Sequence, residues 1–588
     1  MRASRLSLPS DSSPLQLAVG IGLVVISVVL PAVIGSGYWA HNFLVVNLFV
    51  TVAVLQNLLL ADAGQVSFGQ GAVFGLAATT TGIVTGLWHY SYGLGFLAGV
   101  GAALLLGFLF ALPALRVQGY YLGFVTLSAA VVFPQLLVAF NSVTNGINGI
   151  AVSLPGLTRQ NGAGLSWTSL MVVAAALAAL VGHAAFRSTG TGRRMRVAAV
   201  SPEAAMTLGI DPGKLRFLAF TLAALGTGVA GALYVPVLGF VSPYAFRVDL
   251  SIFFFFSVIV GGSGQLVGPV IGVWILNLIP NAIFAELSIY RLLAYGVVAL
   301  LIMLAFPDGV VGSLVKAARS RRLLARVPPI ELGQVLAYRG DDPGTAESRP
   351  TGPAITVRAA RKQFGRLVAL DSVDLSVAGG RVHGLVGPNG SGKTTLLNVI
   401  SGLIRLDGGE VRVRDKITSR LPAYRLAALG FGRTFQTPRV FEEMSIWQNL
   451  EIGADLRGGH HWLLRVLRPF HAAWSAGRPD VLAHAQRRVL ETLRMIATDA
   501  DVLLLDEPAA GLSPEERRDF ATLIRFLRDR LGKTILLVEH DLHLVWRVAD
   551  RISVLDAGQI VAEGAPAEIA DNPRVRALFT GSVDAAGR

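Results

Sequence analysis

The sequence contains no cysteine, which excludes disulfide bonds and metal sites built on thiolates. The redox compartment therefore cannot be read from cysteine usage. Charged residues are also scarce, at 15% of 588 residues against 53% hydrophobic residues. A chain this poor in charge is too apolar for an ordinary soluble protein and favours membrane-spanning segments. The apolar residues fill the first half and thin out near residue 315, so the chain has two parts of different character.

The net charge of +13 does not indicate a nucleic-acid-binding protein. Many of the arginines lie in short loops beside apolar segments, as the positive-inside rule for membrane proteins predicts. We therefore expect the partner of these charges to be a membrane, and we expect no nucleic acid.

Long apolar runs dominate the first half. Runs of roughly twenty apolar residues can cross a bilayer as helices, and here they predict about ten spans. No small-residue cleavage site follows the first run, which is therefore predicted to be a span and not a removed signal peptide. The expected spans are residues 15–35, 41–61, 66–87, 93–113, 119–140, 167–186, 215–237, 248–267, 268–287 and 290–306.

Basic loops predict the orientation of the spans. The positive-inside rule places two arginine-rich segments, residues 187–196 and 316–326, in the cytoplasm, and the N-terminal Arg2 and Arg5 with them. Both ends on one side require an even number of spans, which agrees with ten. We expect a multi-pass protein of the cytoplasmic (inner) membrane. The basic residues concerned are Arg187, Arg193, Arg194, Arg196, Lys316, Arg319, Arg321, Arg322 and Arg326.

A group of polar side chains interrupts the second and third apolar runs. Polar groups inside a membrane are costly and usually face a cavity or a partner helix. The sequence leaves two interpretations open, a lining of the solute path or hydrogen bonds between helices. The group is Gln56, Asn57, Asp62, Gln65, Ser67 and Gln70.

Residues 326–353 are rich in Pro, Gly and charge, with no sustained apolar period, and predict an exposed tether. We expect a membrane domain at 1–315, a cytoplasmic linker at 316–353 and a second domain at 354–588. The expected fold is a polytopic α-helical membrane domain followed by an α/β P-loop NTPase.

The NTPase prediction rests first on a glycine-rich loop between an apolar strand and a helix. The segment fits GxxxxGK[ST] in full and in the required context. Backbone N–H groups and the helix N-terminus would bind phosphates, Lys393 would reach the β- and γ-phosphates, and Thr394 would ligate Mg²⁺. The residues expected to bind ATP here are Gly387, Pro388, Asn389, Gly390, Ser391, Gly392, Lys393, Thr394 and Thr395.

Two further apolar strands end in chemically active side chains. In "DVLLLDEP", Asp506 is placed to hold Mg²⁺ through water, and Glu507 to orient or deprotonate the attacking water. In "TILLVEHD", His540 ends the strand and is placed for a γ-phosphate contact. An acid pair alone would be weak evidence, but after a phosphate loop it indicates an ATPase.

Taken together, these segments resemble the nucleotide-binding domain of ABC transporters, from residue 354 to about residue 581. The resemblance implies that Phe364 stacks on adenine and that Gln436 senses Mg²⁺ and the membrane domain. It also implies that His540 is the switch histidine and that residues 509–512 form the D-loop. "GRTFQ" and "DEPAAGLSP" resemble the ATPases of branched-chain amino acid importers in particular.

The first half resembles the permease subunit of the same importers. "NLLLADAGQVSFGQGAVFG", "LRVQGYYLGFVTLS", "NGINGI" and "GGSGQLVGPVIG" carry this likeness. "SPEAAMTLGIDPGKLRFLAF" resembles the family's cytoplasmic coupling helix, which would dock near Gln436. The coupling residues implied are Pro202, Glu203, Ala204, Ala205 and Gly209. The chain thus resembles two usually separate subunits fused into one.

One motif departs from the family pattern. Where ABC ATPases carry a segment close to LSGGQ, this chain has LAHAQ, at the family's spacing from Asp506. We call residues 482–486 the signature segment. Relatives also vary at the serine and first glycine positions, so the replacement of the second glycine is the more serious departure, because a Cβ restricts the backbone there. The segment consists of Leu482, Ala483, His484, Ala485 and Gln486.

The resemblance implies a dimer in which each ATP lies between one subunit's phosphate loop and the other's signature segment. LAHAQ would then serve the partner's ATP, and a heteromer with one weaker site is expected, with self-dimerisation as the alternative. The implied complex needs a second permease, a second ATPase and an extracytoplasmic binding protein. The expected activity is ATP-driven import of branched-chain amino acids. Import of urea, amides or aromatic acids, and a regulatory membrane protein with little hydrolysis, remain open, whereas the permease likeness opposes an exporter.

Overall fold

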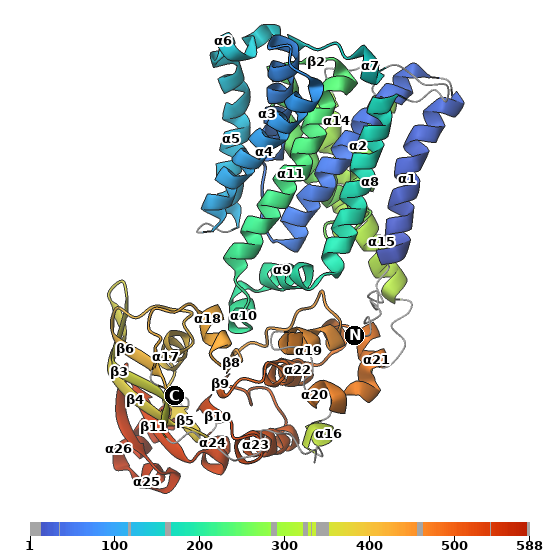
Figure 1. The fold of residues 1–588 in the computed structure, drawn as a ribbon. Coiled ribbons are helices and arrows are strands. Elements are labelled where there is room, and N and C mark those ends of the chain that lie inside the picture. The colour runs from blue at the N-terminus through green and yellow to red at the C-terminus, as the bar shows by residue number, and fades with distance from the viewer. Residues whose placement is uncertain are drawn as a thin grey trace, which may run out of the picture. The chain divides into compact units, whose positions relative to one another are not determined.

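The structure is a computed structural model that describes residues 13–34, 36–115, 119–158, 166–283, 291–320, 327–330, 332–336, 352–414, 416–455, 462–540 and 542–584. The chain divides into two compact units, and each is described by itself. Unit 1 contains Met1–Val200 and Pro212–Ala325, and unit 2 contains Ser201–Asp211 and Arg326–Arg588. Figure 1 labels their helices and strands.

The described residues of unit 1 form helices and one short strand pair, β1 (Ile150–Ala151) and β2 (Phe240–Val241). Several helices begin at a serine that caps a free backbone N–H, as Ser91 does for Leu94 at the start of α4. The long helices are α1 (Ser13–Ile34), α2 (Gly37–Asn57), α3 (Gln70–Gly82), α4 (Tyr92–Ala114), α5 (Tyr120–Ala139), α8 (Trp167–Ser188), α9 (Gly190–Val200), α11 (Pro212–Leu238), α12 (Val248–Gly261), α13 (Gly268–Ile283), α14 (Arg291–Ala305) and α15 (Gly309–Ser320). The shorter elements are η1 (Leu58–Asp62), η2 (Ile83–Leu87), α6 (Asn141–Thr144), η3 (Gly146–Asn148), α7 (Pro155–Thr158) and η4 (Pro243–Phe246).

Among the described residues, 8 helices are long and apolar enough to cross a membrane. Seven of the expected spans coincide with these helices, and the eighth helix, Gly296–Ala318, overlaps the expected span at 290–306 but extends past it. The expected span at 66–87 is shorter, because helix α3 starts only at Gln70. The span expected at 268–287 corresponds to α13, and its last residues, 284–287, lie outside the described part of the chain. Arg2, Arg5, Arg321, Arg322 and Arg326, used above to predict the orientation, also lie outside it.

Helix α2 does not end in an ordinary turn. It continues into the π-helical turn η1, and residues 63–69 are then non-helical. The freed backbone groups find partners within the protein: the N–H of Gln65 donates to the carbonyl of Leu59 (2.8 Å), and the Gln56 amide donates to the carbonyl of Ser67 (2.8 Å). A helix break among apolar spans is tolerated only when such groups are satisfied.

Small residues allow α11 to pack closely against α4. A Cβ added at Gly228 would lie 2.7 Å from the Cβ of Ala103, so no larger residue fits without displacement. Close packing over small residues is typical of helices in a membrane, where lipid supplies no hydrophobic driving force between helices.

The described residues of unit 2 form two sheets. The larger has the order β12-β11-β5-β10-β9-β8, and all its neighbouring strands are parallel except the β11–β12 pair. Every residue of β5 (Val382–Val386), β9 (Val502–Asp506) and β10 (Thr534–Val538) is buried. Parallel strands bring their carboxyl ends to one edge of the sheet, which is where ligands bind in such folds.

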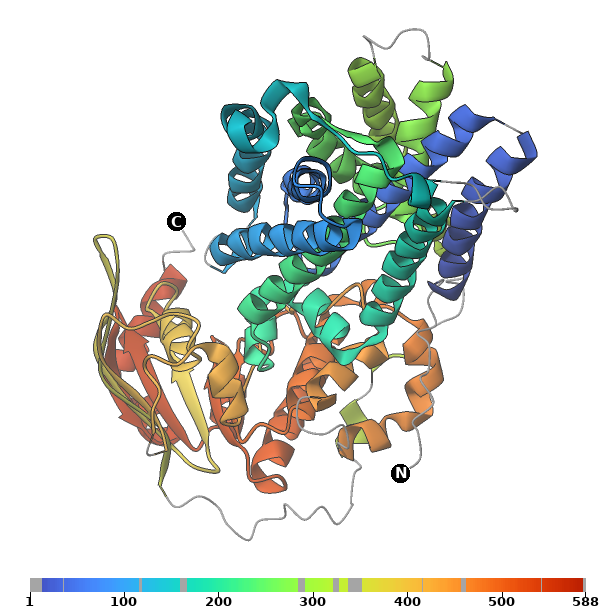
Figure 2. The same cartoon turned by 45° about the horizontal axis from the view of Figure 1, so that its top comes forward.

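The smaller sheet is antiparallel, with the order β4-β3-β6-β7. Strands β3 (Pro353–Phe364), β4 (Leu367–Ala378) and β6 (Gly408–Val413) lie at one end of unit 2, and α19 to α22 gather at the other (Figure 1, Figure 2). The remaining strands are β7 (Lys416–Ile417), β8 (Phe431–Arg433), β11 (Arg551–Asp556) and β12 (Gln559–Gly564). The helices are α10 (Pro202–Thr207), α16 (Leu332–Leu336), α17 (Lys393–Ile400), α18 (Ala423–Ala428), α19 (Ile446–Ala454), α20 (Trp462–Val466), η7 (Arg468–Phe470), α21 (His471–Ala476), η8 (Pro479–Val481), α22 (His484–Ala497), α23 (Pro514–Asp529), α24 (Leu542–Val548), α25 (Pro566–Asp571) and α26 (Pro573–Asp584).

The structure describes only part of the expected linker, residues 316–353. Some of the described residues are buried, so the prediction of an exposed tether was wrong for them. Helix α16 packs against α23, and Val335 is fully buried in the apolar core of unit 2 together with Ile330 and Leu332. These apolar residues are too few to give a sustained period, but their burial anchors the chain before the first strand of unit 2.

Candidate functional site

The phosphate loop lies between β5 and α17, in the strand–loop–helix order that the sequence predicts. Gly392 caps α17 with φ +104°, and a Cβ at this position would lie 2.5 Å from the carbonyl oxygen of Ala369. Glycine is required there both because of the positive φ and because a Cβ would clash with this carbonyl oxygen. The loop therefore leads directly into the free N–H groups of the first turn of α17, an arrangement suited to phosphate.

Lys393 is the positive side chain of this loop. Its Nζ donates to the carbonyl oxygens of Gly387 and Pro388, both at 2.8 Å. Burial lowers the pKa of Lys393, while the neighbouring carboxylates of Glu507 and Asp506 act in the opposite direction. The lysine is thus electrostatically coupled to the acid pair at the end of β9.

Two buried oxygen atoms at the site make no hydrogen bond within the described residues, Ser391 Oγ and Asp506 Oδ1. The described residues also contain no cluster of three or more His, Asp or Glu side chains that could hold a metal alone. This donor set fits Mg²⁺, which binds through one or two protein oxygens and completes its shell with phosphates and water. Thr394 and Asp506, with Gln436, would hold the ion, which would neutralise charge on the phosphates.

The acid pair stands at the end of β9 beside the predicted glutamine and histidine. The Gln436 Nε2 donates to Glu507 Oε2 (3.0 Å), and His540 Nδ1 lies 3.8 Å from the same oxygen. The backbone N–H of Glu507 donates to the carbonyl of Val538 (2.9 Å), and its φ is +46°, which is unusual for a residue with a side chain. The structure therefore brings the side chains of Gln436, Glu507 and His540 together.

Two charged residues that the sequence analysis did not single out hold this constellation. Arg433 donates to Ser401 Oγ (2.5 Å) and lies 3.4 Å from Asp506 Oδ2. Burial raises the pKa of Asp506, and the Arg433 guanidinium opposes that shift. Glu539 is fully buried and accepts from the N–H groups of Ala509 (2.8 Å) and His540 (3.2 Å). A charge inside an apolar strand, as in "FGRTF", was the available signal for Arg433.

Phe364, the residue that the resemblance assigns to adenine stacking, ends β3 in the antiparallel sheet. The residue is 46% exposed, and Lys362 Nζ lies 5.3 Å from the ring centroid. An exposed aromatic face next to a cation is available for stacking on a flat base.

The signature segment leads into α22. Leu482 is buried, Ala483 occupies the N-cap position, and α22 begins at His484. Ala483 has the extended backbone of a cap (φ −60°, ψ 157°) but no side-chain oxygen to accept a hydrogen bond. The methyl of Ala485 packs against the apolar core of unit 2, and His484 faces Gly511 of the D-loop. The helix start is therefore present but lacks its side-chain cap.

We expect Ala483→Ser to stabilise the protein by about 1 kcal/mol, because serine at an N-cap accepts a hydrogen bond from a free N–H of the first turn. The measurement is the thermal unfolding midpoint of the full-length protein. Ala483→Val adds bulk without an acceptor and serves as the control. Equal midpoints for the two variants would contradict the interpretation of Ala483 as an incomplete cap.

The expected coupling segment, Ser201–Asp211, belongs to unit 2. Helix α10 starts at the cap Ser201, and its residues Ala204 and Ala205 are buried in its packing with α18 and β8. Glu203 Oε2 lies 3.3 Å from Arg439 Nη2, three residues after Gln436. Gly209 has φ +79°, a backbone conformation that favours glycine. The segment is therefore placed beside the loop that carries Gln436.

Within unit 1, the polar residues singled out in the sequence are all buried and hydrogen-bonded. Gln70 Oε1 accepts from Thr227 Oγ1 (2.7 Å), which joins α3 to α11. Asn57 contacts the α12–α13 loop twice, accepting from the N–H of Gly264 (2.9 Å) and donating to the carbonyl of Gln265 (3.0 Å). These bonds join one helix to another helix or to a loop, which is one of the two roles that the sequence left open for these residues.

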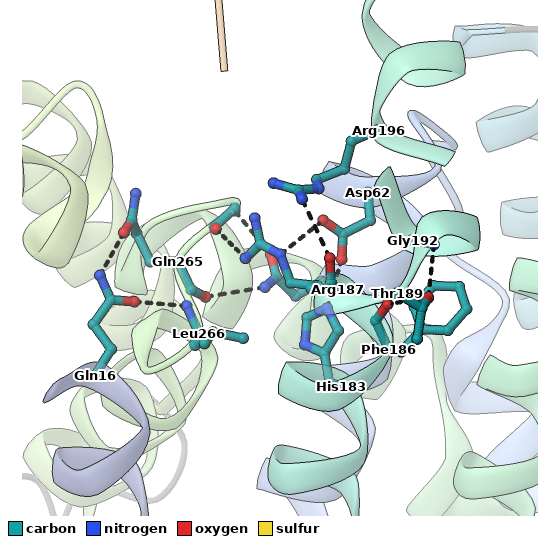
Figure 3. A network of polar contacts seen from close by, with 12 residues as sticks. Gln16, Asp62, His183, Phe186, Arg187, Thr189, Gly192, Arg196, Gln265 and Leu266 are labelled. Carbon is teal, nitrogen blue, oxygen red and sulfur yellow. Dashed lines mark hydrogen bonds and ion pairs between the residues drawn. The ribbon is translucent and has the colours of Figure 1, made fainter. Parts of the chain in front are cut away.

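Asp62 lies at the centre of a buried ionic cluster that the sequence did not predict. Its Oδ2 is 2.5 Å from His183 Nε2, and its Oδ1 is 3.3 Å from Arg187 Nε. Arg187 also donates to the carbonyl of Gly264 (2.5 Å). Figure 3 shows these side chains pointing toward one another, with Gln265 bonded to Gln16 of α1 on the far side of the loop. We call Asp62, His183 and Arg187 the ionic cluster.

Comparison with known proteins agrees with this architecture. Residues 39–306 match the family model of the branched-chain amino acid transport system permease component, and residues 370–510 match that of the ABC transporter. The chain is 35% identical over 253 residues to the high-affinity branched-chain amino acid transport ATP-binding protein LivG of Escherichia coli (strain K12), and 36% identical over 253 residues to BraF of Pseudomonas aeruginosa. Each alignment covers 39% of this chain and 98% of the relative.

Solved structures were also compared with the chain. A nucleotide-free ATP-binding cassette from an ABC transporter is 28% identical, with a TM-score of 0.35, and covers 39% of this chain and 98% of that one. A permease-type membrane part and an ATP-hydrolysing, nucleotide-binding cassette are thus joined in one chain. The protein belongs to the ABC transporter family, as a fusion of a branched-chain-type permease with its ATP-binding component.

Proposed function

We propose that the protein imports branched-chain amino acids, or closely related small solutes, across the cytoplasmic membrane with energy from ATP. The observation that carries this proposal is the presence, in one chain, of a match to the branched-chain permease family and a cassette similar to LivG and BraF. The names of these relatives support branched-chain amino acids as the cargo. Urea, amides and aromatic acids remain alternatives within the same family.

In this proposal the cassette hydrolyses ATP with the residues that the geometry brings together. Lys393 and the loop backbone bind the phosphates, and Phe364 stacks on adenine. Asp506, Thr394 and Gln436 would hold Mg²⁺, which would supply positive charge that favours phosphoryl transfer. Glu507 orients or deprotonates the attacking water, and His540 contacts the γ-phosphate.

The chain would work as part of a larger complex. One chain supplies one permease and one ATPase, so a second of each is needed, either from other subunits or from a second copy. An extracytoplasmic binding protein would deliver the solute. Unit 2 and the N-terminus would lie in the cytoplasm, where ATP is available.

The test is affinity purification of the tagged chain from its own membranes, followed by mass spectrometry of the proteins that accompany it. A second permease, a second ATPase and a binding protein are expected. The binding protein can then be screened against leucine, isoleucine, valine, urea, short amides and aromatic acids. Binding of urea alone, for example, would contradict the proposed cargo but not the transport function.

A regulatory protein that binds ATP with little hydrolysis is a second candidate, favoured by the missing cap at Ala483. Vanadate trapping of nucleotide in the purified complex separates the two. Trapping that depends on Mg²⁺ supports a transport ATPase, whereas failure to trap with all partners present supports the regulatory function.

A further inference from the structure

Arg488 lies in α22, two residues after the signature segment, and its side chain is directed at the catalytic centre of the same unit. The residue is 2% exposed. Its Nη1 donates to the backbone carbonyl of Glu507 (2.9 Å), and its Nη2 donates to the backbone carbonyl of Gln436 (2.7 Å). One guanidinium therefore joins α22 to two other chain segments, at Gln436 and Glu507, which are proposed to act on Mg²⁺ and on the attacking water.

These contacts close a ring of hydrogen bonds. Gln436 and Glu507 are also joined through their side chains at 3.0 Å, so each is held once by its partner and once by Arg488. The carbonyl of Glu507 accepts a second bond from the N–H of Ala510 (3.2 Å), and its own N–H is bound to Val538. The backbone of Glu507 is thus fixed on both sides at a positive φ, which sets the direction of its carboxylate.

The chemistry of arginine explains this arrangement. The two acceptors belong to separate segments, and a planar guanidinium can donate to both from fixed directions, whereas the single ammonium of lysine cannot reproduce that fork. Burying a charge is also costly, and an apolar side chain would fill the same volume at lower cost. The contacts of Arg488 with the segments of Gln436 and Glu507 therefore indicate that its charge and its donors, and not only its volume, are needed there.

We propose that Arg488 is a positioning residue for ATP hydrolysis. It holds Gln436 and Glu507 in a fixed position relative to the first turn of α22. When the signature segment contacts the nucleotide of one site in a dimer, Arg488 thereby positions Glu507 at the other site. This inference rests on the proposed roles of Gln436 and Glu507. It goes beyond them by linking the two sites of a dimer through one side chain.

The experiment uses the full-length chain in its purified native complex and compares Arg488→Met and Arg488→Lys with the unchanged protein. The readouts are kcat and KM for ATP hydrolysis, the affinity for a fluorescent ATP analogue and the thermal unfolding midpoint. Misplacement of a catalytic group by about 1 Å costs on the order of 100-fold in rate. We expect kcat to fall about 10- to 100-fold in both variants, with KM and nucleotide affinity within about two-fold.

Arg528→Met is the matched control. Arg528 is also a partly buried arginine of a helix, and it donates to the backbone carbonyl of Val548 and to Asp550, away from the site. Its loss is expected to lower the unfolding midpoint while kcat stays unchanged. Should Arg488→Met lower kcat no more than this control does at an equal loss of stability, or should Arg488→Lys restore full kcat, the positioning role is overturned.

Comparing the kcat of the single variants with that of the double variant distinguishes positioning by Arg488 from a purely structural role. If Arg488 acts through Gln436, the kcat loss of Gln436→Ala combined with Arg488→Met is smaller than the product of the single losses. Multiplicative losses would show that the two residues act independently and would refute the proposal. Failure of the proposed hydrolytic role itself is recognised separately, by a Glu507→Gln variant that still hydrolyses ATP at the full rate.

Discussion

Replacing Glu507 with glutamine is expected to lower the rate of ATP hydrolysis by about two to four orders of magnitude, the usual contribution of a positioned general base. The amide has the shape of the carboxylate and can still accept the hydrogen bond from Gln436 Nε2, which the structure places at 3.0 Å. The fold and the phosphate loop should therefore be preserved. Steady-state phosphate release from the purified complex measures the loss, and a fluorescent ATP analogue measures binding, which should be retained.

The control for this experiment is Glu515→Gln. Glu515 is an exposed acid in the first turn of α23, on the same unit, and its loss should leave hydrolysis unchanged. Hydrolysis that survives in Glu507→Gln at the rate of this control would mean that another group activates water. Loss of binding together with hydrolysis would instead assign Glu507 to nucleotide binding.

Replacing Asp62 with asparagine is expected to destabilise unit 1 by about 3 kcal/mol, the size of effect seen when one partner of a buried ion pair is removed. The Asp62 side chain is 2% exposed, and it is in contact with His183 and Arg187 at the same time. Arg187 would keep its bond to Gly264 but lose its carboxylate, with little water to replace it. The thermal unfolding midpoint of the full-length protein in detergent measures the change, and a fall of several degrees is expected.

Asp249→Asn is the matched control. Asp249 pairs with Arg247 at 3.9 Å, but the two side chains are 35% and 64% exposed. An exposed pair contributes about 1 kcal/mol or less, so the midpoint should hardly move. Equal effects of the two substitutions would show that the ionic cluster is not held by its charges.

The sequence predicted where the motifs of unit 2 lie relative to its strands, because each motif is a short contiguous segment. The phosphate loop, the acid pair after β9 and the histidine after β10 each follow a buried strand, and parallel strands bring these ends together. Gln436 lies outside those motifs and came from the family resemblance. Its hydrogen bond to Glu507 agrees with the placement that the resemblance implies.

What the sequence did not predict depends on contacts between distant segments. His183 lies 121 residues from Asp62, and Arg433 lies 73 residues from Asp506, so neither pair forms a local pattern. The break after α2, which shortens the third expected span, was missed for a different reason. Hydropathy reports how apolar a stretch is, but not that the residues after Asp62 leave the helix and satisfy their backbone through Gln56 and Leu59.

Glu507, the residue proposed to act on the attacking water, has a positive φ, so it lowers the stability of its own domain. A side chain in the left-handed region costs on the order of 1 kcal/mol or more, and glycine or asparagine accepts that backbone more readily. Replacing Glu507 with glycine or asparagine would therefore relieve this backbone strain while removing the carboxylate proposed to act on water. Stability and hydrolysis are therefore opposed at this one position of the site.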